Sequence, residues 1–155
     1  KYLLRSKVIK TNNAIEIIEK FYRDSSFCKI KPIYYSQKAL EILSKNNKFI
    51  AITSRPKSLE EETASWIERF FPGKIEKIIC TGQYHLKSFK ISKLDICLNE
   101  DIQIFVEDNL ETSIQCAKNK IKCFLLNKPW NQNGLNKIKN LNRVNNWMEI
   151  VKSIK

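Results

Sequence analysis

Hydrophobic positions along the chain fall into short apolar runs from residue 49 onward, separated by segments with helical spacing. The runs at residues 49–52, 75–80, 102–106 and 122–126 have the length of buried strands and are bounded by polar or turn residues. Between them, apolar side chains recur at the spacing of amphipathic helices. This order of strand, loop and helix predicts an α/β protein with a parallel sheet and helices on both faces.

Helices in the first half of the chain are predicted from capping residues. Asn13 and Glu16 have the spacing of a capping box at the start of a first helix. Ser36 is expected to begin a second helix. Ser58 and Glu61 are expected to cap a third. The third helix has the clearest apolar stripe, formed by Leu59, Thr63, Trp66, Ile67, Phe70 and Phe71.

In the second half, Ser92 and Asp95 are expected to begin a short helix ahead of the strand at 102–106. Another helix is predicted after Asn109, and Pro129 lies in a loop that follows the strand at 122–126. A final amphipathic helix is predicted from the positions of Val144, Trp147, Val151 and Ile154.

Polar residues follow the carboxyl ends of two predicted strands, where ligands bind in open parallel sheets. Hydroxyl groups can donate to phosphate oxygens, and an acidic pair can hold a divalent cation through hard oxygen ligands. An alternative remains open, in which the hydroxyl residues form a turn and the asparagine only caps a helix. The polar residues at these two positions are Thr53, Ser54, Arg55, Glu107, Asp108 and Asn109.

Composition and charge restrict the classes of protein that fit. The 155 residues are 43% apolar and 28% charged, which is a globular composition, and no apolar stretch is long enough to cross a bilayer. The net charge of +12 attracts anions such as nucleotide phosphates. The lysines are spread along every segment and match no nucleic-acid-binding module, so a nucleic acid is the less favoured partner.

The cysteines and the histidine exclude several chemistries. The five cysteines are odd in number and none forms a C-x-x-C pair, which favours a reducing compartment such as the cytoplasm. His85 is the single histidine of the sequence. The sequence therefore lacks a Cys/His cluster with zinc spacing and shows no histidine base paired with a nucleophile.

Several motifs occur in the order found in the haloacid dehalogenase superfamily. They are Ile-Thr-Ser-Arg-Pro at 52–56, Ser-Lys at 92–93, Val-Glu-Asp-Asn at 106–109, Leu-Leu-Asn-Lys-Pro-Trp-Asn at 125–131 and Arg-Val-Asn-Asn-Trp at 143–147. The chain resembles this superfamily over about residues 12–154, and more narrowly the branch that contains the 5'(3')-deoxyribonucleotidases and related nucleotidase-like proteins.

The resemblance implies a magnesium-dependent phosphomonoesterase that acts through an aspartyl-phosphate on a phosphorylated small molecule, such as a nucleoside monophosphate. Thr53 corresponds to the hydroxyl that binds the phosphate, with Ser54 and Arg55 beside it as substrate contacts. Glu107 and Asp108 correspond to the acidic pair that holds Mg²⁺. The implied fold is a three-layer α/β/α, Rossmann-like core at residues 36–155, with residues 1–35 as the remnant of a helical cap.

Lys93 corresponds best to the lysine that stabilises the phosphoryl intermediate, because it opens the helix before the acidic strand. Lys87 and Lys90 are alternatives for this role. Each of the three could instead be a solvated surface charge.

The sequence departs from the family in one large respect, because it contains no Asp-x-Asp motif. In the family this motif lies at the end of a central strand, and its two aspartates supply the nucleophile and the general acid–base. We expect the strand and the motif to lie in a segment ahead of Lys1. Without that strand, the strands at 49–52 and 102–106 would each have an unpaired edge. Residues 2–9 or an oligomer could cover these edges, or the sheet could close by a new strand pairing. The chain as given is expected to be inactive, and the alternative is a catalytically dead relative that binds a ligand or partner.

Overall fold

The computed structural model describes residues 17, 20–22, 29–82, 91–132 and 138–154, and the chain divides into two compact units, 1–32 and 33–155. In the first unit, residues 20–22 are helical, with the rings of Phe21 and Tyr22 5.7 Å apart. The expected cap at Asn13 and the candidate strand at 2–9 lie outside the described residues. The following paragraphs concern the second unit.

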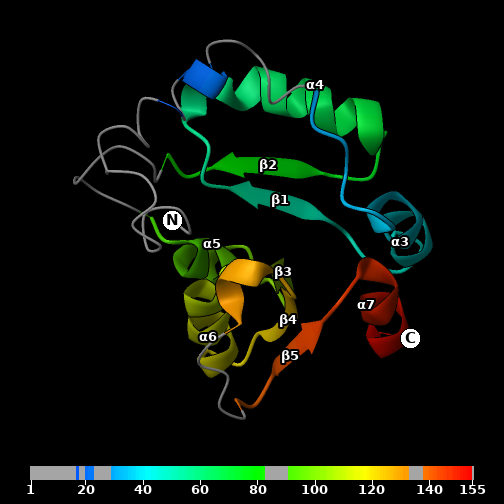
Figure 1. Cartoon of the computed structure of the whole chain (residues 1–155), viewed down its shortest axis with the longest axis vertical. Helices are drawn as coiled ribbons and strands as arrows, with labels where there is room; N and C mark the ends of the chain where they lie inside the picture. Colours follow the sequence, from blue (N-terminus) through cyan, green and yellow to red (C-terminus); the bar gives the residue numbers. More distant parts are fainter. Residues whose placement is uncertain (1–16, 18–19, 23–28, 83–90, 133–137, 155) are drawn as a thin grey trace. The chain divides into compact units, whose positions relative to one another are not determined.

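The second unit has an α/β fold with two small parallel sheets (Figure 1). In the first sheet, β1 (Ile50–Thr53) pairs in parallel with β2 (Lys77–Cys80), so that Thr53 lies opposite Cys80. The chain crosses between the two strands through the short 3-10 helix η2 (Lys57–Leu59) and helix α4 (Glu60–Phe70), which packs against β2. A helical crossover of this kind is what joins parallel strands.

The second sheet has the order β3-β4-β5, and all its pairings are parallel. Its strands are β3 (Ile104–Glu107), β4 (Lys122–Leu126) and β5 (Leu141–Val144). The helices that pack around this sheet are α3 (Ser36–Leu43), α5 (Lys93–Asn99), α6 (Leu110–Lys118) and α7 (Trp147–Ile154).

No helix in the described part of the chain is both long and apolar enough to cross a membrane.

The central strand β4 supplies hydrophobic side chains to both faces of the second sheet, because successive side chains of a strand point in opposite directions. Cys123 packs in a cluster with residues of α5 and α6, whereas Phe124 packs in a cluster with residues of α3 and α7. Figure 1 shows α6 on one side of β4 and α7 on the other. The predicted α/β class with helices on both faces is therefore confirmed for this sheet.

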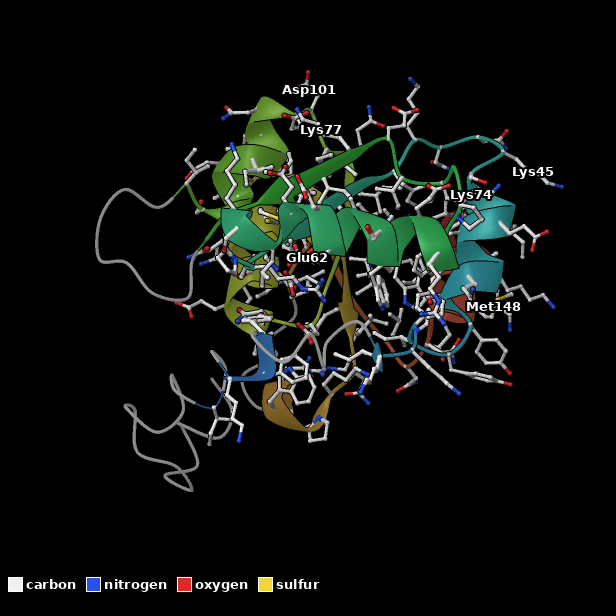
Figure 2. The ribbon with its side chains drawn as sticks, turned by 90° about the horizontal axis from the view of Figure 1, so that it is seen from above. Lys45, Glu62, Lys74, Lys77, Asp101 and Met148 are labelled. Atoms are coloured by element: carbon white, nitrogen blue, oxygen red, sulfur yellow. The ribbon has the colours of Figure 1, made fainter. Side chains whose placement is uncertain are left out.

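The strands β1 and β3 do not pair with each other anywhere in the described residues. All four residues of β1 are half-buried, whereas four of the five residues of β4 are buried. The two sheets still contact, because Ile52 of β1 packs against the cluster that contains Phe105 of β3. Lys77 of β2 also forms an ion pair of 2.5 Å with Glu100 at the end of α5, the region where Lys77 and Asp101 are labelled in Figure 2.

Three helix-start predictions are confirmed, and the first is that a helix, α3, begins at Ser36. Ser92 and Asp95 form a reciprocal capping box at the start of α5. Asn109 caps α6 by accepting the backbone N–H of Thr112 at 3.0 Å. Both caps depend only on residues within four positions of each other, which is why the local sequence identifies them.

Two other predictions were wrong. Ser58 does not cap the third helix, because it lies inside η2 and Leu59 precedes α4 without a side-chain cap among the described residues. Three glutamates in the first turn, Glu60 to Glu62, favour the helix start by their charge instead. Val144 does not belong to the final helix, since it ends β5, and α7 begins at Trp147.

Leu125 and Leu98 provide a matched test of this core. Leu125 of β4 is 0% exposed and Leu98 of α5 is 47% exposed. We expect Leu125→Ala to lower the free energy of unfolding by about 2–5 kcal/mol, because it leaves a cavity in a packed interior. Leu98→Ala should change it by less than about 1 kcal/mol. Urea unfolding followed by circular dichroism measures both, and equal losses would contradict the placement of β4 at the centre of the sheet.

Candidate functional site

The predicted site residues fall into two groups in the structure. The acidic group consists of Lys93, Glu107 and Asp108, which lie at the start of α5 and the end of β3. The hydroxyl group, which follows β1, comprises Thr53, Ser54 and Arg55. Each group comes from the carboxyl end of a parallel strand or from the helix before it, as predicted.

Glu107 is the centre of the acidic group. Its side chain is 7% exposed, and its Oε2 forms an ion pair with the Nζ of Lys93, whose side chain is 17% exposed. Its Oε1 accepts the backbone N–H groups of Asp108 at 2.9 Å and of Asn109 at 3.2 Å. Both carboxylate oxygens of Glu107 are therefore already engaged, as a buried charge requires.

The position of Lys93 follows from the capping box of α5. The Ser92 Oγ accepts the backbone N–H of Asp95 at 3.1 Å, and the Asp95 Oδ2 accepts the backbone N–H of Ser92 at 2.9 Å. These two bonds fix where the helix begins. The side chain of the next residue, Lys93, therefore extends from a defined position on the backbone and reaches Glu107. The local sequence alone is enough to form this box.

The pKa values of the two carboxyl groups in the acidic group are shifted in opposite directions. Burial acts to raise the pKa of Glu107, but the Lys93 ammonium and the hydrogen bonds from Asp108 outweigh it and hold the pKa below its ordinary value. Burial, together with the neighbouring Glu107 carboxyl, raises the pKa of Asp108 from 3.8 to about 6. Asp108 is therefore the carboxyl group of the pair that gains and loses a proton near neutral pH.

The hydroxyl group is organised around Thr53 and Arg55. The Thr53 Oγ1 accepts the backbone N–H of Arg55 at 3.3 Å, which forms a tight turn directly after β1. The Arg55 Nη1 donates to the Oγ1 of Thr63 on α4 at 3.0 Å, and Gly82 N–H donates to the Arg55 carbonyl at 3.0 Å. The hydroxyl proton of Thr53 has no acceptor among the described residues, so it can donate to a ligand oxygen.

The structure brings the acidic group together by direct contacts, but it does not join that group to Thr53. No hydrogen bond or ion pair links Thr53 to Lys93, Glu107 or Asp108 within the residues that the structure describes. The alternative lysines, Lys87 and Lys90, and the single histidine lie outside the described residues.

Sequence reasoning missed two residues near the predicted groups: Arg143, which reaches Asp108 only through Asn131, and Thr81, whose backbone N–H donates to the Thr53 carbonyl at 2.8 Å. Arg143 of β5 donates to the side chain and the carbonyl of Asn131, and Asn131 in turn donates to the Asp108 carbonyl. The Oγ1 of Thr81, beside Thr53 at the end of β2, is buried and has no hydrogen-bond partner among the described residues. The motif Arg-Val-Asn-Asn-Trp contained the signal for Arg143, but nothing local in it points to the loop after β3.

The donor set of the acidic group suits magnesium better than a transition metal. In the described part of the chain, no three histidine, cysteine, aspartate or glutamate side chains gather in a group that could hold a metal ion. Mg²⁺ needs fewer protein ligands, because it keeps several waters and is held by one or two carboxylates together with phosphate oxygens. Asp108, with Glu107 beside it, fits that pattern.

The raised pKa of Asp108 predicts that Asp108→Asn stabilises the protein near neutral pH. The native state binds this proton up to about pH 6 and the unfolded state only up to about pH 3.8, so the contribution of Asp108 to stability falls as pH rises between these values. The gain at pH 7.5 should be on the order of 1 kcal/mol after allowance for partial exposure, and it should vanish near pH 3.

Thermal unfolding of wild type and variant across this pH range measures the difference. Asp101→Asn is the matched control, because Asp101 is exposed in a turn with φ 49° and asparagine accepts that conformation. A stability difference for Asp108→Asn that does not change with pH would contradict the raised pKa.

Comparisons with known proteins were made at three levels: family models, curated proteins and solved structures. No family model, no curated protein and no solved structure matches the chain. The resemblance to the haloacid dehalogenases therefore rests on the ordered motifs of the sequence. At the level of the fold, the chain is an α/β protein with two small parallel sheets, an arrangement compatible with a Rossmann-like fold.

Proposed function

We propose that residues 33–155 form the phosphate- and cation-binding part of a magnesium-dependent phosphomonoesterase of the haloacid dehalogenase type. The substrate class is a phosphorylated small molecule, such as a nucleoside monophosphate, and the nucleophilic aspartate lies outside residues 1–155. The observation that carries this proposal is the acidic group, in which a half-buried lysine and two carboxyl groups with opposite pKa shifts meet at the end of a parallel strand. Perturbed titratable groups of this kind concentrate at functional sites.

The geometry supports different roles for the two carboxylates. Glu107 already accepts bonds with both oxygens, so it holds Lys93 and the start of the Asp108 loop. Asp108 is then the residue that would contact the cation directly. When bound, Mg²⁺ would neutralise phosphate charge at this position.

Lys93 would act on the phosphoryl group as a fixed positive charge. Its ammonium carries three donors, of which the ion pair with Glu107 uses one, so the others can point to phosphate oxygens. Because Glu107 and the capping box hold the side chain in advance, little side-chain freedom is lost when the phosphate binds. Thr53 would add a hydroxyl donor from β1, and Ser54 and Arg55 would contact the remainder of the substrate.

The unpaired edges of β1 and β3 support the part of the proposal that concerns the nucleophile. Each strand ends in one of the two groups and pairs on one side only among the described residues. A parallel strand between them would satisfy both ladders and bring its own carboxyl end between the hydroxyl group and the acidic group. Neither β1 nor the first three residues of β3 carries the charges or prolines that natural proteins use to protect permanent edges.

A second candidate is a binding module without catalysis. The observation that favours it is the sequence itself, since its aspartates, Asp24, Asp95, Asp101 and Asp108, include no Asp-x-Asp pair. Such a module would still bind phosphate and a cation at the same groups. The cysteines Cys97, Cys116 and Cys123 are free and buried, which fits the proposed cytoplasmic location of either candidate.

Cation binding tests the acidic group directly. We expect a Mg²⁺ titration in the presence of inorganic phosphate, followed by isothermal calorimetry, to show binding by the wild type. Asp108→Asn should weaken the affinity by more than about tenfold, because it removes a charged ligand. Asp101→Asn, which removes the same charge from an exposed turn, should leave it unchanged. Equal affinity for Mg²⁺ in wild type and Asp108→Asn would refute the proposed cation site.

An assay of phosphate-ester hydrolysis separates binding from catalysis. Since the sequence has no Asp-x-Asp pair, we expect the 155-residue chain to hydrolyse p-nitrophenyl phosphate no faster than buffer, with or without Mg²⁺. Turnover that needs Mg²⁺ and disappears in Asp108→Ala would show that the nucleophile is present in this chain after all.

A further inference from the structure

The side chain of Asn131 lies at the centre of a hydrogen-bond network outside the two predicted groups. Asn131 ends the short 3-10 helix η3 (Pro129–Asn131), which follows β4, and it is 2% exposed. A buried amide of this kind is costly unless each of its polar atoms has a partner. Its partners come from the ends of all three strands of the second sheet.

The amide group of Asn131 is fully engaged. Its Nδ2 donates to the backbone carbonyls of Asp108 and Leu126, both at 2.8 Å. Its Oδ1 accepts the backbone N–H of Lys128 at 3.1 Å and the Nη1 of Arg143 at 2.6 Å. Two donors and two acceptor positions are all that an amide side chain offers, so the network fixes which end is nitrogen and which is oxygen.

Arg143 supports Asn131 with a second bond. Its Nη2 donates to the backbone carbonyl of Asn131 at 2.6 Å, so the guanidinium forms hydrogen bonds with both the side chain and the main chain of the same residue. The Nη1 of Arg143 also donates to the Oδ1 of Asn127 at 3.0 Å. A planar guanidinium with fixed donors is well suited to hold such a geometry.

The main chain of Asp108 is thereby held on both sides. Its N–H donates to the Oε1 of Glu107, and its carbonyl accepts from the Nδ2 of Asn131. Because the peptide groups on either side of Asp108 are fixed, the direction in which its side chain leaves the backbone is also fixed. We propose that Asn131 is a positioning residue that sets the Asp108 carboxylate for cation binding, an inference that rests on the proposed function.

The chemistry of the network requires asparagine at this position. An aspartate would keep the acceptor for Lys128 and Arg143, but it would lose both donors and place a negative charge beside the carbonyls of Asp108 and Leu126. A near-isosteric change therefore removes the contact with the Asp108 loop without opening a cavity.

Asn131→Asp is the test variant, and Asn127→Asp is its matched control. Asn127 also contacts Arg143 and follows the same strand, but its side chain has its other bonds with Gln132 and Asn145. The control thus adds the same charge beside the same arginine without changing a bond to Asp108. Backbone amide hydrogen exchange, measured by NMR, is the readout.

In Asn131→Asp we expect the amides of Asp108 and Asn109 to exchange about tenfold faster than in wild type, while the amide of Phe124 in β4 keeps its rate. The affinity for Mg²⁺ in the presence of inorganic phosphate should fall about 10- to 100-fold. Asn127→Asp should match wild type in both measurements. Faster exchange at every amide would indicate a general loss of stability and would overturn the positioning role.

If Asn131→Asp does not fold, Arg143→Lys decides the question. It keeps the positive charge but removes the pair of guanidinium hydrogen bonds to the side chain and carbonyl of Asn131. Faster exchange confined to Asp108 and Asn109 supports the proposal, and unchanged exchange at these two amides overturns it. The exchange result does not depend on Mg²⁺. If Asn131→Asp speeds exchange only at Asp108 and Asn109 but the wild type binds no Mg²⁺, the proposed function is refuted, while the hold of Asn131 on the Asp108 loop is not.

Discussion

The ion pair between Lys93 and Glu107 is the interaction on which the candidate site depends. A carboxylate as buried as that of Glu107 is unfavourable unless it is paired and hydrogen-bonded, and here it has an ammonium on one oxygen and two backbone N–H groups on the other. These partners connect the start of α5 to the loop after β3. Burial of Asp108, together with the neighbouring Glu107 carboxyl, raises the pKa of Asp108. The ion pair thus helps to fix the position of the lysine, and its carboxylate contributes to the raised pKa of the neighbouring Asp108.

The second sheet supports this arrangement because its central strand is packed on both faces. The alternating side chains of β4 bind α5 and α6 to one face and α3 and α7 to the other. Parallel pairing brings the carboxyl ends of β3, β4 and β5 to the same edge, and Asn131 forms hydrogen bonds to residues at all three ends. The packed sheet edge and the satisfied buried amide together hold the backbone of the loop after β3.

The first sheet is less complete than the second. β1 is apolar yet only half-buried, and it pairs with a single neighbour in the described residues. The hydroxyl group that follows β1 is ordered by its own turn and by Arg55, not by contacts with the acidic group. This division into two sheets agrees with the proposal that a further strand, which carries the nucleophile, belongs between them.

The sequence by itself determined the elements whose signals are local. The strands near 50, 78, 105 and 124 follow from apolar runs, and the caps at Ser92 and Asn109 follow from bonds between residues three positions apart. Tertiary structure alone decided that β5 is a strand, since two of its four residues are polar and its partner is β4. It also decided that Glu107 holds Lys93 and that Asn131 holds the Asp108 loop. These roles depend on hydrogen bonds between residues 14 and 23 positions apart. The sequence pattern predicts local elements, but it does not predict which distant side chains come into contact when the sheet forms.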